Sequence, residues 1–399
     1  MKRSATWPLV WPILATIALP LIGAWFVWPD HLPPGFGIFP PEFVANPPGF
    51  SLLVFIAVAA VVLLVAALLL FPQWFGFKPA TQPVPPTPRA GLPLWFWPGL
   101  VATLFFWWLM WTRVTPFGDL VYYAFTPMWW GFILVLDGIV YRLNDGRSLL
   151  ATKPATFVIS AIVSVGGWAY FEYLDYFALG NWYYPNTHLP GLSHAQVVVI
   201  FLAAYATVWP AVFEWYLLLN SFPRLVQRYA QGPKLPIPAN LLLGVGFVLL
   251  AAVPFFPYPL FWALWIGPLA VIAGLLVRLG IWTPFASLAR GNWSPMLLMA
   301  LASLFNGFFW EVWNYGSAHP ASLPATNPNY WIYDIPYVNV IHIYAEMPLL
   351  GFFGYLPFGL LVWVFFIWAG ELFGFSPDLG LSRQMHPRVA AEETAVESA

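Results

Sequence analysis

Long apolar stretches alternate with short polar segments along most of this chain. A helix needs about 20 apolar residues to cross about 30 Å of hydrocarbon. The pattern predicts such helices, with ends placed to within a few residues, over 7–28, 50–71, 92–111, 120–141, 154–177, 195–222, 237–256, 260–279, 295–315 and 338–369. We therefore expect an all-α polytopic membrane protein with about ten transmembrane helices.

The positive charges predict an orientation for these helices. If the ten helices are correct, Arg113 alone lies on one side of the membrane. The other side carries Lys2, Arg3, Lys78, Arg89, Arg142, Arg147, Lys153, Arg224, Arg228, Lys234, Arg278, Arg290, Arg383 and Arg388. Because loops rich in Lys and Arg stay in the cytoplasm, we expect both termini to be cytoplasmic and the protein to lie in the cell (inner) membrane.

Composition narrows the possible functions. Of 399 residues, 61% are apolar and 8% are charged, and the net charge is −1. These values exclude a cytosolic enzyme, a nucleic-acid binder and a disordered chain. The absence of cysteine excludes a disulfide scaffold and a thiolate metal site. Aromatic residues make up 20% of the chain, which suggests that rings line a binding site.

Comparison of the chain with itself indicates an internal duplication. Gly131, Gly138 and Arg142 recur as Gly267, Gly274 and Arg278, and the segment 171–176 resembles 310–315. We expect an N-terminal two-helix unit with a Pro-rich linker (1–91), two repeats of four helices (92–236 and 237–370) and a flexible acidic tail (371–399). An even number of helices per copy predicts a parallel tandem repeat. The recurring glycines favour close helix packing.

Six acidic residues fall inside the predicted spans: Asp137, Glu172, Asp175, Glu214, Glu311 and Glu346. A carboxylate at the bilayer centre costs roughly 2.5–3.5 kcal/mol, so such residues usually face the protein interior and mark function. Asp137 lies beside Tyr141 and Arg142, where an interfacial ion pair is the simpler interpretation. Glu214 is equally consistent with a functional acid and with a buried acid bonded to Trp or Tyr.

Helical spacing and two aromatic loops predict a shared pocket. Glu172 and Asp175 share one helix face, as do Glu311 and Asn314, and His342 and Glu346 share a face of the last predicted helix. We name Glu172, Glu311 and Glu346 as acid or base candidates, with Asp175 and His342 orienting them. The candidate binding residues are Trp182, Tyr184, Asn314, Trp331, Tyr333 and His194. Structural hydrogen bonding by the glutamates, and an ordinary interfacial position for the histidines, remain alternatives.

Acids without a basic partner, enclosed by Trp and Tyr, suit acid catalysis on a lipid. A protonated carboxyl group would protonate a double bond or an epoxide, and aromatic faces would stabilise the carbocation. The expected substrate is a membrane lipid or isoprenoid, and no cofactor or metal is expected because no Glu-x-x-His occurs. Two other functions stay open. One is a proton- or cation-coupled transporter using Asp137, Glu214 and Glu346, and the other is a non-catalytic subunit that binds pigment or lipid.

The run from Asp175 through Gly180, Trp182, Tyr184 and Pro185 to Gly191 resembles the integral-membrane lycopene cyclase domain of carotenoid biosynthesis. In that family, an Asp that ends a helix precedes a G-x-W-x-aromatic loop, a Pro and a pair of Glu. In the second copy Trp331, Tyr333, Glu346 and Pro348 have a similar spacing, although Glu346 is single and Asn314 replaces the Asp. The resemblance implies a cyclase-like activity in which Asp175 shapes the pocket and Glu346 is a candidate acid.

Overall fold

The computed structural model describes residues 7–79, 88–113 and 115–380. Lys2, Arg3, Arg383, Arg388 and most of the predicted tail lie outside the described residues. The α-helices in the described part are α1 (Trp7–Val27), α2 (Leu52–Leu70), α3 (Phe96–Thr112), α4 (Phe125–Leu143), α5 (Leu149–Thr152), α6 (Pro154–Phe177), α7 (His194–Tyr205), α8 (Val208–Asn220), α9 (Pro223–Arg228), α10 (Ala239–Ala252), α11 (Ala263–Arg278), α12 (Pro284–Leu288), α13 (Ser294–Ala318) and α14 (Tyr355–Phe373).

Three 3-10 helices and two short strands complete the secondary structure of the described residues. The 3-10 helices are η1 (Pro72–Phe75), η2 (Thr115–Tyr123) and η3 (Leu349–Gly354). The strands β1 (Trp182–Tyr183) and β2 (Ile332–Tyr333) form one antiparallel pair. We call this pair of strands the ribbon.

Several helices are long and apolar enough to cross a membrane, as the sequence predicts. Six described spans meet this condition: Trp7–Val27, Leu52–Leu70, Pro154–Phe177, His194–Asn220, Ser294–Ala318 and Leu349–Phe373. A seventh is reached if η2 and α4, which meet at a bend of 65°, count as one span. The apolar helices α3, α10 and α11 are shorter. The chain is therefore a mostly helical, multi-pass membrane protein.

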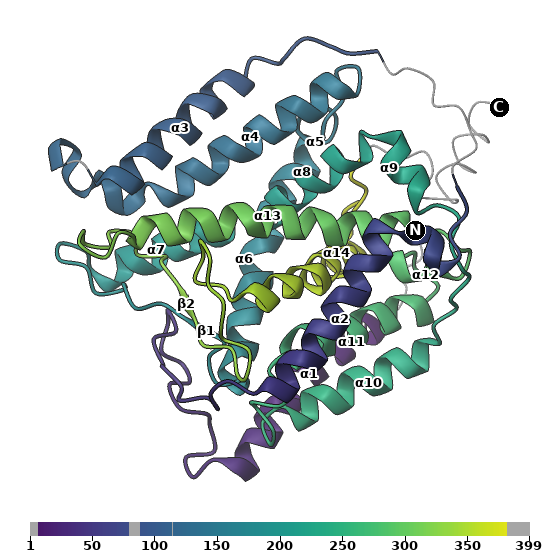
Figure 1. Cartoon of the computed structure of the whole chain (residues 1–399), viewed down its shortest axis with the longest axis horizontal. Helices are drawn as coiled ribbons and strands as arrows, with labels where there is room; N and C mark the ends of the chain where they lie inside the picture. Colours follow the sequence, from purple (N-terminus) through teal and green to yellow (C-terminus); the bar gives the residue numbers. More distant parts are fainter. Residues whose placement is uncertain (1–6, 80–87, 114, 381–399) are drawn as a thin grey trace.

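Two helix pairs flank a central group of helices (Figure 1). The α3–α4 pair and the α10–α11 pair lie on opposite sides of α13 and α14. Both pairs pack closely at glycines. A Cβ added to Gly131 would lie 2.7 Å from the Gly99 carbonyl oxygen of α3, and one added to Gly267 would lie 2.8 Å from Leu250 of α10. The recurring glycines thus let neighbouring backbones approach, as expected.

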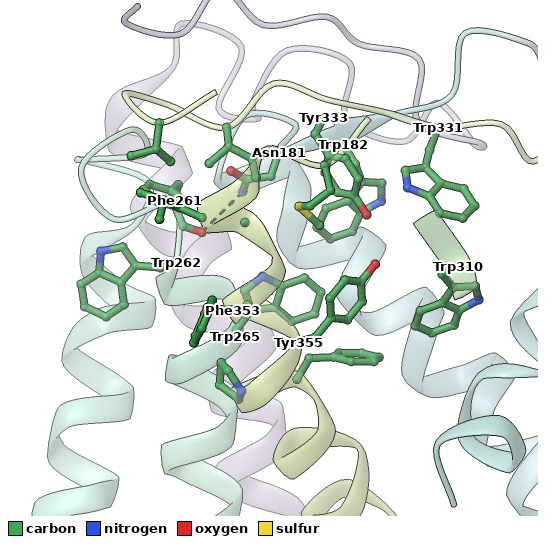
Figure 2. A pocket seen from close by; sticks show the side chains of 18 of the residues that line it. Asn181, Trp182, Phe261, Trp262, Trp265, Trp310, Trp331, Tyr333, Phe353 and Tyr355 are labelled. Atoms are coloured by element: carbon green, nitrogen blue, oxygen red, sulfur yellow. Dashed lines mark hydrogen bonds between the residues drawn. The ribbon is translucent and has the colours of Figure 1, made fainter. Parts of the chain in front are cut away.

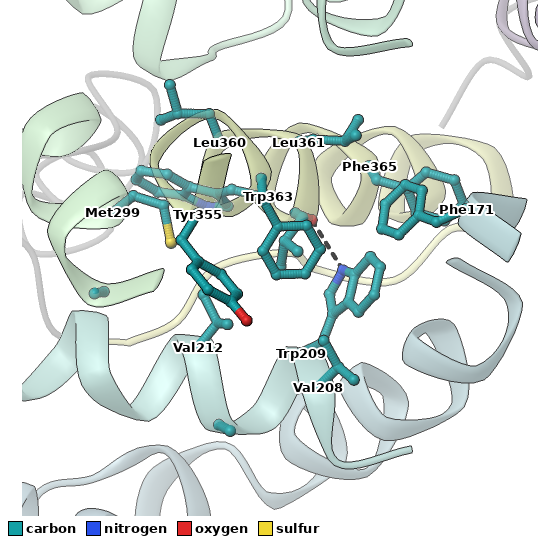
Figure 3. Close-up of a cluster of buried hydrophobic side chains, with 14 of the residues drawn as sticks. Phe171, Val208, Trp209, Val212, Met299, Tyr355, Leu360, Leu361, Trp363 and Phe365 are labelled. Atoms are coloured by element: carbon teal, nitrogen blue, oxygen red, sulfur yellow. Dashed lines mark hydrogen bonds between the residues drawn. The ribbon is translucent and has the colours of Figure 1, made fainter. Parts of the chain in front are cut away.

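Aromatic side chains fill the space between the central helices (Figure 3). The Trp209 indole of α8 donates a hydrogen bond to the Val362 carbonyl oxygen of α14 at 2.9 Å. Phe171 of α6 stacks on the Trp209 ring, with centroids 5.8 Å apart. Side chains from α1 to α14 join in this same continuous core, so α6, α8 and α14 hold a fixed position behind the ribbon.

The predicted helix over 338–369 is wrong in its first part. Residues 338–348 form an irregular segment, and the helical structure starts only at Leu349. Ile341 has a φ of 65°, which no α-helix allows. Pro348 also lacks the N–H that a continuing helix needs. His342 and Glu346 therefore do not share a helix face.

The predicted helix over 195–222 is interrupted between α7 and α8. Pro210 lies in the first turn of α8. Its ring would clash with the carbonyl group four residues earlier, at Ala206, and this is where α7 ends. The backbone at Ala206 and Thr207 stays close to helical, so α7 and α8 still form one span, and Tyr205 at the end of α7 is buried.

Candidate functional site

A large apolar cavity lies beneath the ribbon (Figure 2). Its volume is about 650 Å³, within the range of small-molecule sites. Residues from α2, α4, α6, α7, α8, α11, α13, η3, α14 and both strands line it. Fourteen of the thirty lining residues are aromatic, and none carries a formal charge. The cavity can therefore accept an apolar molecule, and its walls are rich in aromatic faces.

The ribbon that covers this cavity is fixed to the ends of α6 and α13 by two equivalent contacts. Asp175 of α6 accepts hydrogen bonds from the backbone N–H and the side-chain amide of Asn181, at 2.9 and 3.3 Å. Asn314 of α13 accepts from the Trp331 N–H at 3.0 Å and donates to the Trp331 carbonyl at 2.8 Å. Asp175 and Asn314 thus position the strands rather than face the cavity.

Glu172 lies one turn before Asp175 and is enclosed by donors. Its Oε1 accepts hydrogen bonds from Tyr184 (2.5 Å), Tyr205 (2.9 Å) and the Trp168 indole (2.9 Å). Its Oε2 accepts from the Trp182 indole at 3.1 Å. Both oxygens are satisfied, and the residue is only 2% exposed. Glu172 therefore ties α6 to the ribbon and to α7.

Glu311 occupies the corresponding place on α13 but has fewer partners. Its Oε1 accepts from Tyr333 (2.8 Å) and Tyr355 (2.6 Å). Its Oε2 is buried and makes no hydrogen bond of ordinary geometry among the described residues, although the Met347 backbone N–H lies near the carboxyl group. Glu311 precedes Asn314 by three residues, as Glu172 precedes Asp175. The Glu311 carboxyl group is therefore held by fewer side chains than that of Glu172.

The difference between the two glutamates has a local cause. Trp168, a donor to Glu172, lies four residues before it, and the residue four before Glu311 is Gly307. A Cβ at Gly307 would lie 2.4 Å from the Tyr355 ring, so that ring fills the space beside the glycine. The Trp331 indole, which corresponds to that of Trp182, makes no hydrogen bond among the described residues. Glu311 consequently lacks both indole donors.

Four tyrosines separate the glutamates from the cavity. Tyr184, Tyr205, Tyr333 and Tyr355 line it, whereas Glu172 and Glu311 do not. Burial, followed by the nearby Glu172 carboxyl, raises the pKa of Tyr184 well above its usual value. Burial and Glu311 do the same to the pKa of Tyr333. A bound molecule would thus meet phenol hydroxyl groups first and the carboxyl groups behind them.

The remaining candidates from the sequence lie farther from the cavity. Glu346 is in the irregular segment, accepts a hydrogen bond from Tyr330 at 2.6 Å and lies 3.6 Å from His319. His342 is exposed and contacts Asn339 at 3.2 Å. His194 is an exposed residue at the start of α7. The structure thus brings together Glu172, Asp175, Glu311, Asn314 and the predicted aromatic residues Trp182, Tyr184, Trp331 and Tyr333. Glu346 lies beside this group, and both histidines lie outside it.

The interpretation of Asp137 as an interfacial ion pair is wrong. Asp137 is fully buried and accepts hydrogen bonds from the Trp95 indole (2.9 Å), the Ser148 hydroxyl (2.8 Å) and the Leu150 N–H (2.9 Å). It joins α3, α4 and α5 and does not line the cavity. Glu214 is also fully buried, and its carboxyl group lies against that of Asp137, without a hydrogen bond to Trp or Tyr among the described residues. The predicted bond from Glu214 to Trp or Tyr is therefore absent there.

Three residues that contact the glutamates were not predicted: Trp168, Tyr205 and Tyr355. Trp168 could have been found, because it precedes Glu172 by one helical turn. Tyr205 and Tyr355 are at a spacing close to that of the pair His194 and His342. Extending the self-comparison to the end of α7 would therefore have identified them.

Within the described residues, no group of three or more His, Asp and Glu side chains could hold a metal ion. Comparison with protein families, with curated proteins and with solved structures finds no match to this chain. The cavity and the two glutamates behind it are therefore the features of the protein that bear on its function.

Proposed function

We propose that this protein is an integral membrane enzyme that acts on an isoprenoid or related lipid by carboxylic-acid proton catalysis, in the manner of a cyclase, isomerase or hydratase. The observation that carries the proposal is that Oε2 of Glu311 makes no hydrogen bond of ordinary geometry among the described residues. A buried carboxyl group without a cation partner is most stable in its neutral form. Two phenol groups on Oε1 leave the acidic proton on Oε2, where no protein acceptor holds it.

The catalytic step moves one proton from Glu311 to the substrate through a tyrosine. The Glu311 carboxyl group first turns so that its protonated oxygen faces the hydroxyl oxygen of Tyr333 or Tyr355. This tyrosine then gives its hydroxyl proton to one carbon of a double bond and takes the proton of Glu311. The other carbon of that bond becomes a carbocation. After ring closure or a shift of the double bond, a carbon releases a proton to the tyrosine oxygen, and the tyrosine passes its own proton back to Glu311. If water adds to the cation instead, the added water supplies this proton. The product is an isomer of the substrate, or is heavier by one water if water adds to the cation.

The aromatic walls and Glu172 have supporting roles in this proposal. Trp310 and Tyr355 have ring centroids 6.1 Å apart and line the cavity beside Glu311. A desolvated cation over such rings gains about 2 kcal/mol or more. Glu172 keeps Trp182 and Tyr184 in the opposite wall through its hydrogen bonds. Glu346 and Asp175 shape the surroundings of the cavity. For Asp175, the resemblance to the lycopene cyclase domain implies the same role.

We further propose the finer membrane arrangement expected from the sequence. The three shorter helices α3, α10 and α11 would complete ten spans, with both termini cytoplasmic in the inner membrane. A parallel repeat is supported by the register of the ribbon. Tyr183 pairs with Ile332, and Trp182 pairs with Tyr333. Tyr183 and Ile332 are equivalent positions of the two copies, so a two-fold axis through this pair relates α6 to α13.

A second function, a non-catalytic subunit that binds lipid or pigment, is favoured by one observation. The carboxyl groups lie behind the tyrosines and do not line the cavity. If their only task is to hold those tyrosines, bound lipid is the whole function. In that case Trp310→Ala would release the molecule, and Glu311→Gln would leave it bound.

Expression in a bacterium that accumulates linear isoprenoids tests the proposal. Wild type is compared with Glu311→Gln at matched membrane levels, followed by untargeted lipid mass spectrometry. Glu371→Gln is the control, because this exposed residue at the end of α14 undergoes the same chemical change. We expect a lipid of unchanged mass, or one heavier by water, with wild type and Glu371→Gln only. The same new lipid with Glu311→Gln at wild-type yield would refute the role of Glu311.

A further inference from the structure

The wall of the cavity is thinnest at α2. Ala57, Val58, Val61 and Val62 of this helix line the cavity. On the outside, α2 is covered by almost nothing, since Leu69 is its only buried residue. One helix therefore separates the cavity from the surroundings of the protein on this side.

The cavity reaches the protein surface between α2 and the start of α11. Val61 and Trp262 line the cavity and are 61% and 40% exposed. Figure 2 shows Trp262 at one side of the lining residues and Trp310 at the opposite side. A molecule that enters beside Trp262 would therefore pass along the cavity toward Trp310 and Tyr355. Because Val61 and Trp262 line the cavity and are also exposed, we call the cavity wall at these two residues the mouth.

The surface around the mouth is apolar. Every side chain of α2 is hydrocarbon, from Leu52 to Leu70. This helix meets the length and hydropathy of a membrane span. A surface of this kind in a membrane protein contacts lipid chains. The mouth consequently faces the hydrocarbon layer and not water.

Hydrogen bonds attach α2 to the rest of the protein near its two ends. The Ser51 N–H at one end donates to the Tyr337 carbonyl oxygen at 3.1 Å. At the other end, the Tyr229 hydroxyl donates to the Leu69 carbonyl oxygen at 2.7 Å. Between these points only van der Waals contacts hold the helix, because its side chains are apolar. Small residues, Ala57 and Val58, face the cavity there.

We propose that an apolar ligand enters the cavity sideways from the bilayer, through the mouth at Val61 of α2 and at Trp262, the residue that precedes α11. The inference rests on the proposed function only in taking the cavity as a lipid site. It adds the route of entry and the two residues that determine its width. A ligand on this route never leaves the hydrocarbon layer, and an uncharged lining does not require it to carry a charged headgroup.

Cross-linking of the mouth tests this route. The chain contains no cysteine, so Val61→Cys/Trp262→Cys carries only the two thiols needed for a flexible bismaleimide linker. The probe is a hexadecane that bears a mid-chain diazirine, added to the protein in lipid vesicles. After illumination, mass spectrometry compares labelling of the cavity segment 353–358 with that of Val248, an exposed residue of α10. The lipid-facing Val248 serves as an internal reference.

The order of addition decides the outcome. Probe added before the linker should remain in the cavity and label it, whereas probe added after the linker should label the cavity at least fivefold less. Val61→Cys/Leu64→Cys treated in the same way is the control, because Leu64 is exposed and does not line the cavity. Equal labelling in the two orders would overturn the lateral route. If the protein without linker never takes up the probe, the lipid cavity itself is refuted, which is a separate result.

Discussion

Exchanging each buried glutamate for glutamine should separate a structural carboxyl group from a chemical one. In Glu172→Gln, the amide oxygen can keep the three donors of Oε1. The new NH2 group then faces the Trp182 indole N–H, which lies 3.1 Å from the present Oε2. Two donors would point at each other in a buried place. Leaving a buried donor unsatisfied costs about 1–3 kcal/mol.

The same exchange at position 311 should be nearly neutral for stability. The amide oxygen keeps the hydrogen bonds from Tyr333 and Tyr355. The NH2 group replaces an oxygen that makes no hydrogen bond of ordinary geometry among the described residues. Because the two hydrogen bonds of ordinary geometry are both kept, we expect a loss below about 1 kcal/mol. Glu311→Gln should therefore fold normally while losing its acidic proton.

The assay is reversible unfolding in mixed detergent and SDS micelles, followed by tryptophan fluorescence. The free energy of unfolding of wild type, Glu172→Gln and Glu311→Gln is compared, with Glu371→Gln as the surface control. The reasoning would be refuted if Glu311→Gln lost as much stability as Glu172→Gln. That result would mean that Oε2 of Glu311 has a structural partner.

Three further changes test other parts of the structure. Arg113→Ala should cost about 1–3 kcal/mol of unfolding free energy, since its guanidinium donates to the carbonyls of Gly316 (3.3 Å) and His319 (3.4 Å) at the end of α13, and Arg113→Lys should not restore it. Gly131→Ala should destabilise the α3–α4 contact by about 1–3 kcal/mol, whereas Gly166→Ala, which meets nothing within 4 Å, should not destabilise the protein; thermal unfolding measures both. Burial raises the pKa of Asp334 above 3.8, because it disfavours the charged carboxylate in the folded protein. The protonated side chain is free of this penalty below pH 3.8, and the protein loses stability as the pH rises through the raised pKa. Asp334→Asn should therefore raise the unfolding midpoint at pH 7 and leave it unchanged below pH 3.8, and a titration of the midpoint that shows no such convergence would exclude this role.

The helices were predictable because a membrane span requires a long, uninterrupted apolar stretch of sequence. Apolar length alone placed α6 at 154–177, where the structure has it. The segment 338–348 is as apolar as a helix, but local backbone geometry decides its shape. The φ of 65° at Ile341 and the proline at 348 prevent a continuous helix there, although the hydropathy of the segment fits one. Apolar length cannot detect such a break.

The site was predictable only where neighbours in sequence are neighbours in space. Glu172 and Tyr184 are close along the chain, so their spacing in the sequence was enough to predict that they lie in one site. Tyr355 reaches Glu311 from another helix, and the sequence does not contain the orientation of that helix. The same is true of α2, whose uniform apolar sequence gives no sign of which residues face a cavity. Hydrogen-bond satisfaction, which distinguishes Glu311 from Glu172, requires all of these positions at once.

Isotope transfer from water tests the central claim most directly. Purified protein in lipid vesicles is incubated in D2O with the linear isoprenoid that it converts, and the product is examined by mass spectrometry. The protein is equilibrated in D2O before the substrate is added and is used in excess over it, so that each Glu311 carries deuterium and acts once. The account then predicts one carbon-bound deuterium in the product of wild type and no labelled product from Glu311→Gln. A product without deuterium, or equal labelling with Glu311→Gln, would contradict proton catalysis by Glu311.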